Sequence, residues 1–161
     1  TDVPLVVSAV GDSARPRSSR PRRERLRKST TSMHTAAIAT IGALREEGMV
    51  ENAARVGAEV IGPELARIAE RHPSVGEVRG AGVFWAVELV KDSETREPLA
   101  PYGASSDAMN KVIAACKSSG MLPFANFNRI HVVPPCIVTD DEAREGLAIL
   151  DAALEVADRS L

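Results

Sequence analysis

Residues 75–90 constrain the fold of this chain more than any other segment, because they carry the pattern of a buried strand. The sequence there reads VGEVRGAGVFWAVELV. Successive side chains along a strand point to opposite faces. One face would carry Val83, Trp85, Val87 and Leu89, and the other Phe84, Ala86, Glu88 and Val90. Both faces are mostly apolar, so the pattern predicts a largely buried strand, preceded by a shorter one at residues 75–79.

Two helices are predicted before these strands. Residues 36–47 carry a face rich in Ala, Ile and Leu that ends before Gly48, and a second helix is expected over residues 51–72. Gly62-Pro63 falls inside the second helix, so we expect a kink or a restart there. The buried stripe of this helix is predicted at Ala54, Ala58, Ile61, Leu65 and Ile68.

One more strand and two more helices are predicted after residue 105. Ser106 can cap a helix that ends at Gly120, and Thr139 with Glu142 forms a capping box for the last helix. Between them, RIHVVPP predicts a third strand that the two prolines stop. The expected core positions of the two helices are Met109, Val112, Ile113 and Cys116, then Ala143, Leu147, Leu150, Leu154 and Ala157.

This order of elements predicts an α+β fold. We expect a small, mainly antiparallel three-stranded sheet with helices packed on one face, preceded by a helix pair and a disordered basic N-terminal arm. The arm would occupy residues 1–33 and the folded domain residues 34–161.

The charge distribution supports that division. Residues 1–28 carry eight basic and three acidic side chains, a net charge of +5, whereas residues 29–161 carry a net charge of -7. Like charges and the prolines at 16 and 21 favour disorder in the arm. A solvated tail is one interpretation, and binding of nucleic acid or an acidic protein is the other.

Several classes of protein are disfavoured by composition. Aromatic residues make up only 3% of the chain, which argues against a stacking surface for single-stranded nucleic acid. No apolar run has the roughly 18 residues of a membrane span. The three histidines are scattered, so no metal site is predicted, and Cys116 and Cys136 are expected to be small core residues. A cytoplasmic location is the default expectation.

Specific strings of residues go further than composition. EVRGAGVFWAVELVKDSETREPL at 77–99 and NRIHVVPPCIVTDDEAREGLAILDAAL at 128–154 resemble the C-terminal small domain of class III aminotransferases. These are fold-type I enzymes that depend on pyridoxal phosphate. The resemblance extends from about Ile38 to Leu161 and includes the helix ending in ERHP, the Arg-Gly-x-Gly turn at 79–82 and the Pro-Pro pair before the last helix.

The resemblance implies a transaminase, which moves an amino group between an amino donor, either an amino acid or an amine, and a keto acid. In the family, the Schiff-base lysine and the phosphate-binding turn lie in a large domain that precedes the matched region. The resemblance therefore implies a truncated enzyme with no catalytic residue in this chain, and we expect no pyridoxal phosphate bound to the chain alone. The alternative function is a non-enzymatic binding module whose basic arm contacts nucleic acid or an acidic protein, with nucleic acid the less favoured partner.

Three residues are candidates for ligand contacts on the strength of the resemblance. Thr30 echoes a family threonine that contacts the cofactor phosphate of the neighbouring subunit, although a threonine that caps or leads into a helix is common. Many members carry a carboxylate-binding arginine four residues before the second proline, where this chain has His131. Arg129 lies on the same strand face and has the planar fork that suits a carboxylate, but a structural salt bridge is an equal alternative.

The family also forms dimers in which this domain takes part. The helices at 36–47 and 51–72 have more apolar surface than a three-stranded sheet can cover, so we expect a homo-oligomer that associates through this helix pair.

Overall fold

The structure is a computed structural model that describes the backbone of residues 22–161 and the side chains of residues 32–161. The described residues fall into two units, 22–41 and 42–161, and each is described by itself. Most of the predicted arm lies outside the described residues. The predicted domain boundary after residue 33 stays a prediction.

The first helix, α1 (Arg22–Glu46), begins twelve residues before the predicted domain start at residue 34. Among its described side chains, those of residues 32–41 are all exposed, including Met33, Ile38 and Ile41. The apolar face that we predicted is therefore present on α1, and the described residues leave it exposed.

The second predicted helix is interrupted where Pro63 suggested that it would be. It consists of α2 (Met49–Val56), a π-helical turn η1 (Gly57–Ile61) and α3 (Gly62–Arg71). Pro63 has no backbone N–H, so the turn before it cannot complete a regular α-helical hydrogen bond. The wider turn shifts the helix register, and this explains why only three of the five predicted stripe positions are buried. Ile61, Leu65 and Ile68 are buried, whereas Ala54 and Ala58 are exposed and Val56 and Val60 take their places.

The sheet has four strands rather than the predicted three. The strands β1 (Val75–Ala81), β2 (Phe84–Leu89), β3 (Phe124–Asn126) and β4 (Arg129–Val132) lie in the order β1-β2-β4-β3, and every pair is antiparallel. The sequence did not indicate β3 because it is only three residues long. A tight turn joins it to β4, with Phe127 at a positive φ of 56°.

The last two helices follow the prediction closely. Ser106 accepts a hydrogen bond from the Met109 amide at the start of α4 (Asp107–Ser118), and both hydrogen bonds of the predicted capping box begin α5 (Asp140–Asp158). All five predicted core positions of α5 are buried. Cys116 is buried as expected, but Cys136 is exposed because it follows the prolines in the turn before α5.

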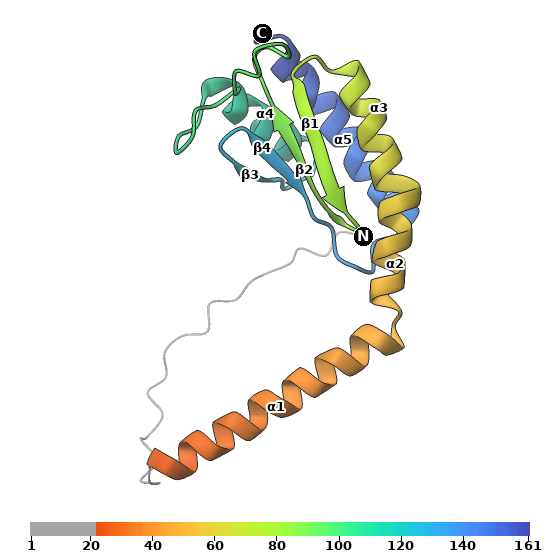
Figure 1. Cartoon of the computed structure of the whole chain (residues 1–161), viewed down its shortest axis with the longest axis vertical. Coiled ribbons are helices and arrows are strands. Elements are labelled where there is room, and N and C mark those ends of the chain that lie inside the picture. Colours follow the sequence, from red (N-terminus) through yellow and green to blue (C-terminus); the bar gives the residue numbers. More distant parts are fainter. Residues whose placement is uncertain (1–21) are drawn as a thin grey trace. The chain divides into compact units, whose positions relative to one another are not determined.

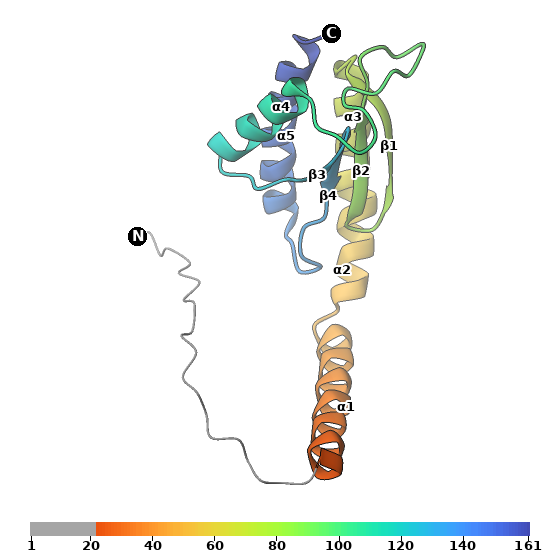
Figure 2. The ribbon, with the colours of Figure 1, turned by 90° about the vertical axis from the view of Figure 1, so that its left-hand side faces the viewer.

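The helices cover one face of the sheet and leave the other open. Figures 1 and 2 show α4 and α5 behind the sheet, with α3 packed beside β1. Val87 and Ile130 point into this core and are almost fully buried. Phe84 points the other way and is 62% exposed, so the prediction that both faces of this strand are buried is wrong. In the part of the chain that the structure describes, no helix is long and apolar enough to cross a membrane.

A buried polar network attaches the end of α3 to the end of α5. The imidazole of His72 lies 2.5 Å from Asp158 through Nδ1 and 2.9 Å from Asp151 through Nε2. Ser74 donates its hydroxyl to Asp158 at 2.6 Å. Burial opposes a charge on the His72 ring, but the hydrogen bonds to the two carboxylates outweigh it and raise the pKa of His72 above 6.5.

We predict that His72→Gln destabilises the protein in a pH-dependent manner. Because the folded-state pKa is raised, the stabilisation by His72 is fully present below about pH 6.5 and is lost as the pH rises through the folded-state pKa. The loss of unfolding free energy should be about 2 kcal/mol at pH 6 and smaller at pH 9, measured by urea denaturation.

His131→Gln is the matched control, because burial and two arginines lower the pKa of His131. Any stabilisation that comes from the titration of His131 is present above about pH 6.5 and is lost as the pH falls. The pH dependence of the unfolding free energy of His131→Gln therefore has the opposite sign to that of His72→Gln. If His72→Gln lowers the unfolding free energy equally at pH 6 and pH 9, the interpretation that a charged His72 stabilises the network is wrong.

A second prediction concerns Gly57, at the closest approach of helix and sheet. A Cβ atom at Gly57 would overlap the backbone of Gly82 in the turn between β1 and β2. Gly57→Ala should therefore lower the unfolding free energy by about 2 kcal/mol or more. Gly146→Ala, on α5 with nothing within 4 Å of the added Cβ, should leave stability unchanged or raise it by up to ~1 kcal/mol. Thermal unfolding of both variants tests the pair, and equal melting temperatures would disprove the close contact.

Candidate functional site

The candidate site is the open face of the sheet, formed by the side chains that point away from the helices. Antiparallel pairing sets Ala86 of β2 opposite His131 of β4, and Glu88 opposite Arg129. Residues directly opposite one another on neighbouring strands point to the same face. We define the open face by Glu77, Arg79, Phe84, Glu88, Phe124, Arg129 and His131.

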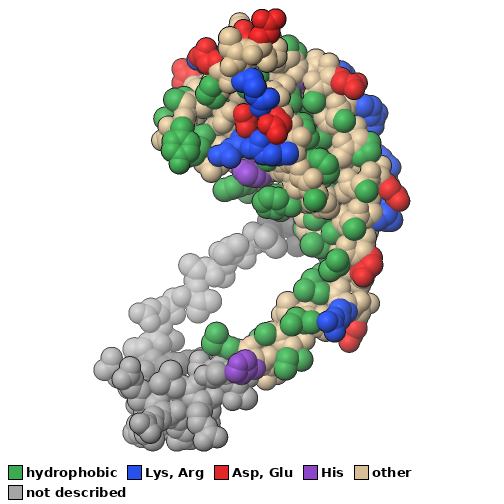
Figure 3. Space-filling model, in the orientation of Figure 1, with side chains coloured by type: hydrophobic (Ala, Val, Ile, Leu, Met, Phe, Trp, Pro, Cys, Tyr) green, Lys and Arg blue, Asp and Glu red, His purple; other side chains and the backbone are tan. Residues whose placement is uncertain are grey.

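Two carboxylates on the open face are paired with two arginines. Glu77 lies 3.0 Å from both Arg79 and Arg96, and Glu88 lies 3.4 Å from Arg79 and 3.6 Å from Arg96. The hydrogen bond from Arg79 is the main cause of a lowered pKa at Glu77. Glu88, the one charged residue on an otherwise apolar strand, is thus paired with two arginines. Figure 3 shows this group of arginine and acidic side chains, with a histidine and apolar side chains beside it.

Arg129 lies opposite Glu88 but forms no ion pair with it. Among the described residues, Arg129 has no salt bridge within 4.0 Å and no side-chain hydrogen bond, because Glu88 is engaged by Arg79 and Arg96. The side chain is half-buried. The structural salt bridge that we considered for Arg129 is thus not formed within the described part of the chain. Its guanidinium has all its donors available for an anion.

His131 lies between two phenylalanine rings. The centroid of the His131 ring lies 6.3 Å from that of Phe84 and 5.2 Å from that of Phe124. Burial is the main cause of a lowered pKa at His131, and the positive charges of Arg129 and Arg79 lower it further. The lowered pKa favours the neutral form of the imidazole. No pattern in the sequence predicted Phe124 at this position, because it lies on the strand that was not predicted. The alternation along β2 did place Phe84 on the same face as Glu88, although that face was expected to be buried.

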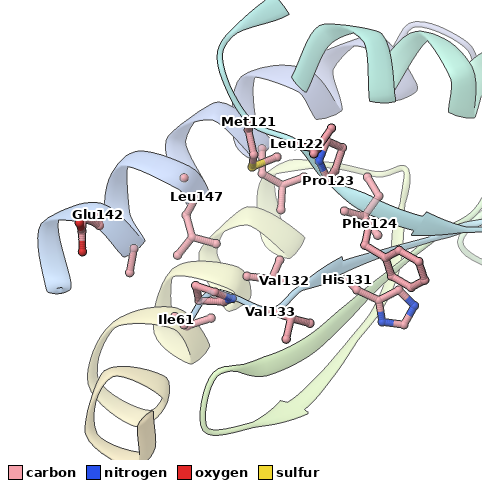
Figure 4. Close-up of a pocket in the computed structure, with 15 residues that line it drawn as sticks. Ile61, Met121, Leu122, Pro123, Phe124, His131, Val132, Val133, Glu142 and Leu147 are labelled. Carbon is pink, nitrogen blue, oxygen red and sulfur yellow. The ribbon is translucent and has the colours of Figure 1, made fainter. Parts of the chain in front are cut away.

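An apolar hollow of about 270 Å³ opens beside His131. We define the hollow by its lining residues, which come from η1, the segment before β3, β4, the turn after it and α5: Ile61, Met121, Leu122, Pro123, Phe124, Ile130, His131, Val132, Val133, Pro134, Glu142, Ala143, Gly146, Leu147 and Leu150. Figure 4 shows Leu147 and Ile61 on one side of the hollow and the rings of Phe124 and His131 together on the other. Glu142 is held by the capping box, where its carboxylate accepts hydrogen bonds from Thr139.

Thr30 belongs to α1, in the first of the two units. Its backbone lies inside α1, eight residues after the helix begins, so it is not the capping residue of that helix. Its side chain is outside the described residues, and its predicted contact with a cofactor phosphate stays a prediction.

The described lysines all lie on the surface. Lys91 is exposed and lies 2.6 Å from Glu97, and Lys111 and Lys117 are exposed on α4. None of them lines the hollow. A Schiff-base lysine requires a shaped pocket in which the amine meets the cofactor carbonyl. Within residues 32–161 there is also no group of three or more His, Cys, Asp or Glu side chains that could hold a metal.

We therefore predict that the purified chain forms no stable covalent adduct with pyridoxal phosphate. After incubation and borohydride reduction, mass spectrometry should find at most scattered, substoichiometric labelling of exposed lysines. Stoichiometric labelling of a single lysine, together with a visible absorption band before reduction, would refute this prediction.

Comparison with known proteins identifies the family. The model of the family described as aminotransferase class-III matches residues 31–154. The chain is 32% identical over 136 residues to the taurine–pyruvate aminotransferase of Bilophila wadsworthia, which covers 80% of this chain and 28% of that protein. It is 34% identical over 131 residues to the taurine–pyruvate aminotransferase of Rhodobacter capsulatus, covering 77% and 27% respectively.

The structure is also similar to that of a solved aminotransferase. The taurine:2-oxoglutarate aminotransferase of Bifidobacterium kashiwanohense, in complex with PLP and glutamate, superposes with a TM-score of 0.72 at 31% identity. The match covers 78% of this chain and 28% of that one. The chain thus belongs to the class-III aminotransferase family, whose members bind pyridoxal phosphate, and it spans about a quarter of the length of these relatives.

Proposed function

We propose that residues 34–161 are the C-terminal small domain of a pyridoxal-phosphate-dependent aminotransferase, which moves an amino group between an amino donor and a keto acid. The family match over residues 31–154 supports this proposal. The cofactor supplies the electron sink for transamination, and the lysine that holds it comes from residues outside this chain. By itself the chain is inactive.

In this proposal Arg129 binds the carboxylate of the substrate. The observation that carries this role is the lack of any ion-pair partner for Arg129 among the described residues, on a face where the neighbouring arginines are paired. A guanidinium binds a carboxylate through two parallel charge-assisted hydrogen bonds. His131, which is neutral and adjacent, can accept or donate one hydrogen bond next to it.

We also propose that the intact enzyme is a homo-oligomer that associates through α1 and α2. Both helices expose large apolar side chains: Met33, Ile38 and Ile41 on α1 are at least 50% exposed, and Val50 on α2 is 64% exposed. A second subunit would remove this surface from water.

The role of Arg129 can be tested in a chimera. Residues 31–161 would replace the matching segment of the Bilophila wadsworthia taurine–pyruvate aminotransferase, and the chimera should retain transaminase activity. Arg129→Lys keeps the charge but loses the fork, so kcat/KM for amino donors with a carboxylate should fall roughly 30- to 150-fold, equivalent to ~2–3 kcal/mol. Amines without an acid group should be nearly unaffected, and His131→Ala should cost less.

Arg144→Lys is the matched control, because Arg144 is exposed on α5 and lies near Asp141 rather than on the open face. It should leave all substrates unchanged. If Arg129→Lys instead lowers the melting temperature and slows every substrate alike, Arg129 is a structural brace. A folded chimera that binds the cofactor but has no transaminase activity would contradict the domain assignment.

A further inference from the structure

Four charged side chains at one end of the open face form a closed ring, which we call the charge ring: Glu77, Arg79, Glu88 and Arg96. Each arginine contacts both carboxylates, at 3.0 Å to Glu77 and at 3.4 Å or 3.6 Å to Glu88. Strand pairing sets Glu77 directly opposite Glu88, where two like charges repel each other. The two arginines offset this repulsion because each bridges the pair, and the charge ring has no net charge.

Arg96 reaches the charge ring from a loop, residues 91–98, whose shape is fixed by its own contacts. The ammonium group of Lys91 lies 2.6 Å from the Glu97 carboxylate, and the Lys91 amide donates to the Glu97 carbonyl at 2.7 Å. The carboxylate of Asp92 accepts hydrogen bonds from two backbone amides of the loop. Arg96 has a positive φ of 58°, a conformation that is uncommon outside glycine and persists only where the surroundings favour it. Its two ion pairs with the sheet favour it here.

Arg129 adjoins the charge ring but does not belong to it. Glu88 lies directly opposite Arg129 on β4, on the side away from Glu77. Opposite charges at such positions of an antiparallel pair attract each other. Even so, no ion pair within 4.0 Å joins Glu88 to Arg129 in the part of the chain that the structure describes. The charge count supplies a reason, because the ring already holds as many arginines as carboxylates.

We propose that Arg96 is a positioning residue for Arg129. By completing the charge ring it holds Glu88 toward β1, and the guanidinium of Arg129 stays unpaired. Without Arg96 the ring would have two carboxylates and one arginine, so Glu88 would pair with Arg129 across the strands. The proposal deepens the proposed function and rests on it for what Arg129 then binds, but the arrangement of charges can be tested on the 161-residue chain itself.

His131 reports whether Arg129 is paired. Burial lowers the pKa of His131 most, and the charges of Arg129 and Arg79 lower it further. The other two side chains that contact the ring of His131 are Phe84 and Phe124, which do not titrate. A carboxylate paired with Arg129 offsets its positive charge, so the pKa of His131 would rise toward its ordinary value of 6.5.

The decisive variant is Arg96→Gln in the full chain, followed by NMR. We expect the pKa of His131, from titration of its ring signals, to rise toward 6.5, and exchange of the Arg129 Nε–H with water to slow about fivefold as the ion pair forms. Arg96→Gly accepts the positive φ without strain but has no charge, and it should give the same result. Arg96→Lys keeps the charge and should remain close to the wild type.

Two controls separate the charge ring from other effects. Lys91→Gln changes the same loop but removes a charge that is paired with Glu97, so the pKa of His131 should not change. Arg129→Gln should itself raise the pKa of His131, and adding Arg96→Gln to it should raise the pKa no further, because the effect of Arg96 passes through Arg129. Thermal unfolding confirms that each variant is folded.

Three results would overturn the proposal. The first is an unchanged His131 pKa and an unchanged Arg129 exchange rate in Arg96→Gln. The second is the same rise for Arg96→Gln in the Arg129→Gln background, which would mean that Arg96 acts on His131 directly. The third is wild-type behaviour of Arg96→Gly, which would assign the effect to the shape of the loop rather than to its charge. None of these readouts needs transaminase activity, so this proposal and the proposed function can fail separately.

Discussion

The packing of this domain depends on the close contact between Gly57 and the turn that joins β1 to β2. The absence of a side chain at Gly57 lets the helix backbone touch the backbone of Gly82, which itself adopts a positive φ of 53°. Trp85 closes the contact from the side, since its indole N–H donates to the Gly82 carbonyl at 2.6 Å. A Cβ at Gly62 would lie 3.1 Å from the same indole ring, so a side chain there would crowd the ring. The Arg-Gly-x-Gly turn is therefore a packing device as well as a turn.

This contact determines which residues the sheet presents to solvent. Once the helices lie against Val87 and Ile130, the alternation along β2 and β4 places Phe84, Glu88, Arg129 and His131 on the opposite face. Burial of one face of the sheet is therefore enough to expose the side chains of the candidate site on the other. A shift of one residue in the pairing of β4 would bury Arg129 and His131 and expose Ile130, which is why the apolar alternation and the site are specified together.

The sequence predicted the parts of the fold in which local pattern and tertiary packing agree. The stripe of α5 and the caps at Ser106 and Thr139 are regular features, and each was located correctly. The four-stranded sheet was not predicted, because three residues are too short to show a strand period and the turn at Phe127 lacks the usual glycine. The positions of Ala54 and Ala58 were wrong because an α-helical period was assumed across a π turn. Of the candidate site, Arg129 and His131 could be placed on one face from their spacing. The choice of Arg79 and Arg96, rather than Arg129, as the partners of Glu88 is a tertiary contact that the sequence pattern does not show.

The π turn η1 is the part of the helix that the sequence pattern predicted wrongly, and it also forms part of the wall of the hollow. A π-helical turn is less stable than an α-helical one and persists only where the surroundings favour it. Here Pro63 removes the competing α-helical hydrogen bond, and the extra residue brings Val60 and Ile61 into the core while Ile61 also lines the hollow. A regular helix would turn Ala58 inward instead and would change the wall opposite Leu147. The irregular turn that hid the helix stripe in the sequence thus also shapes the apolar hollow beside His131.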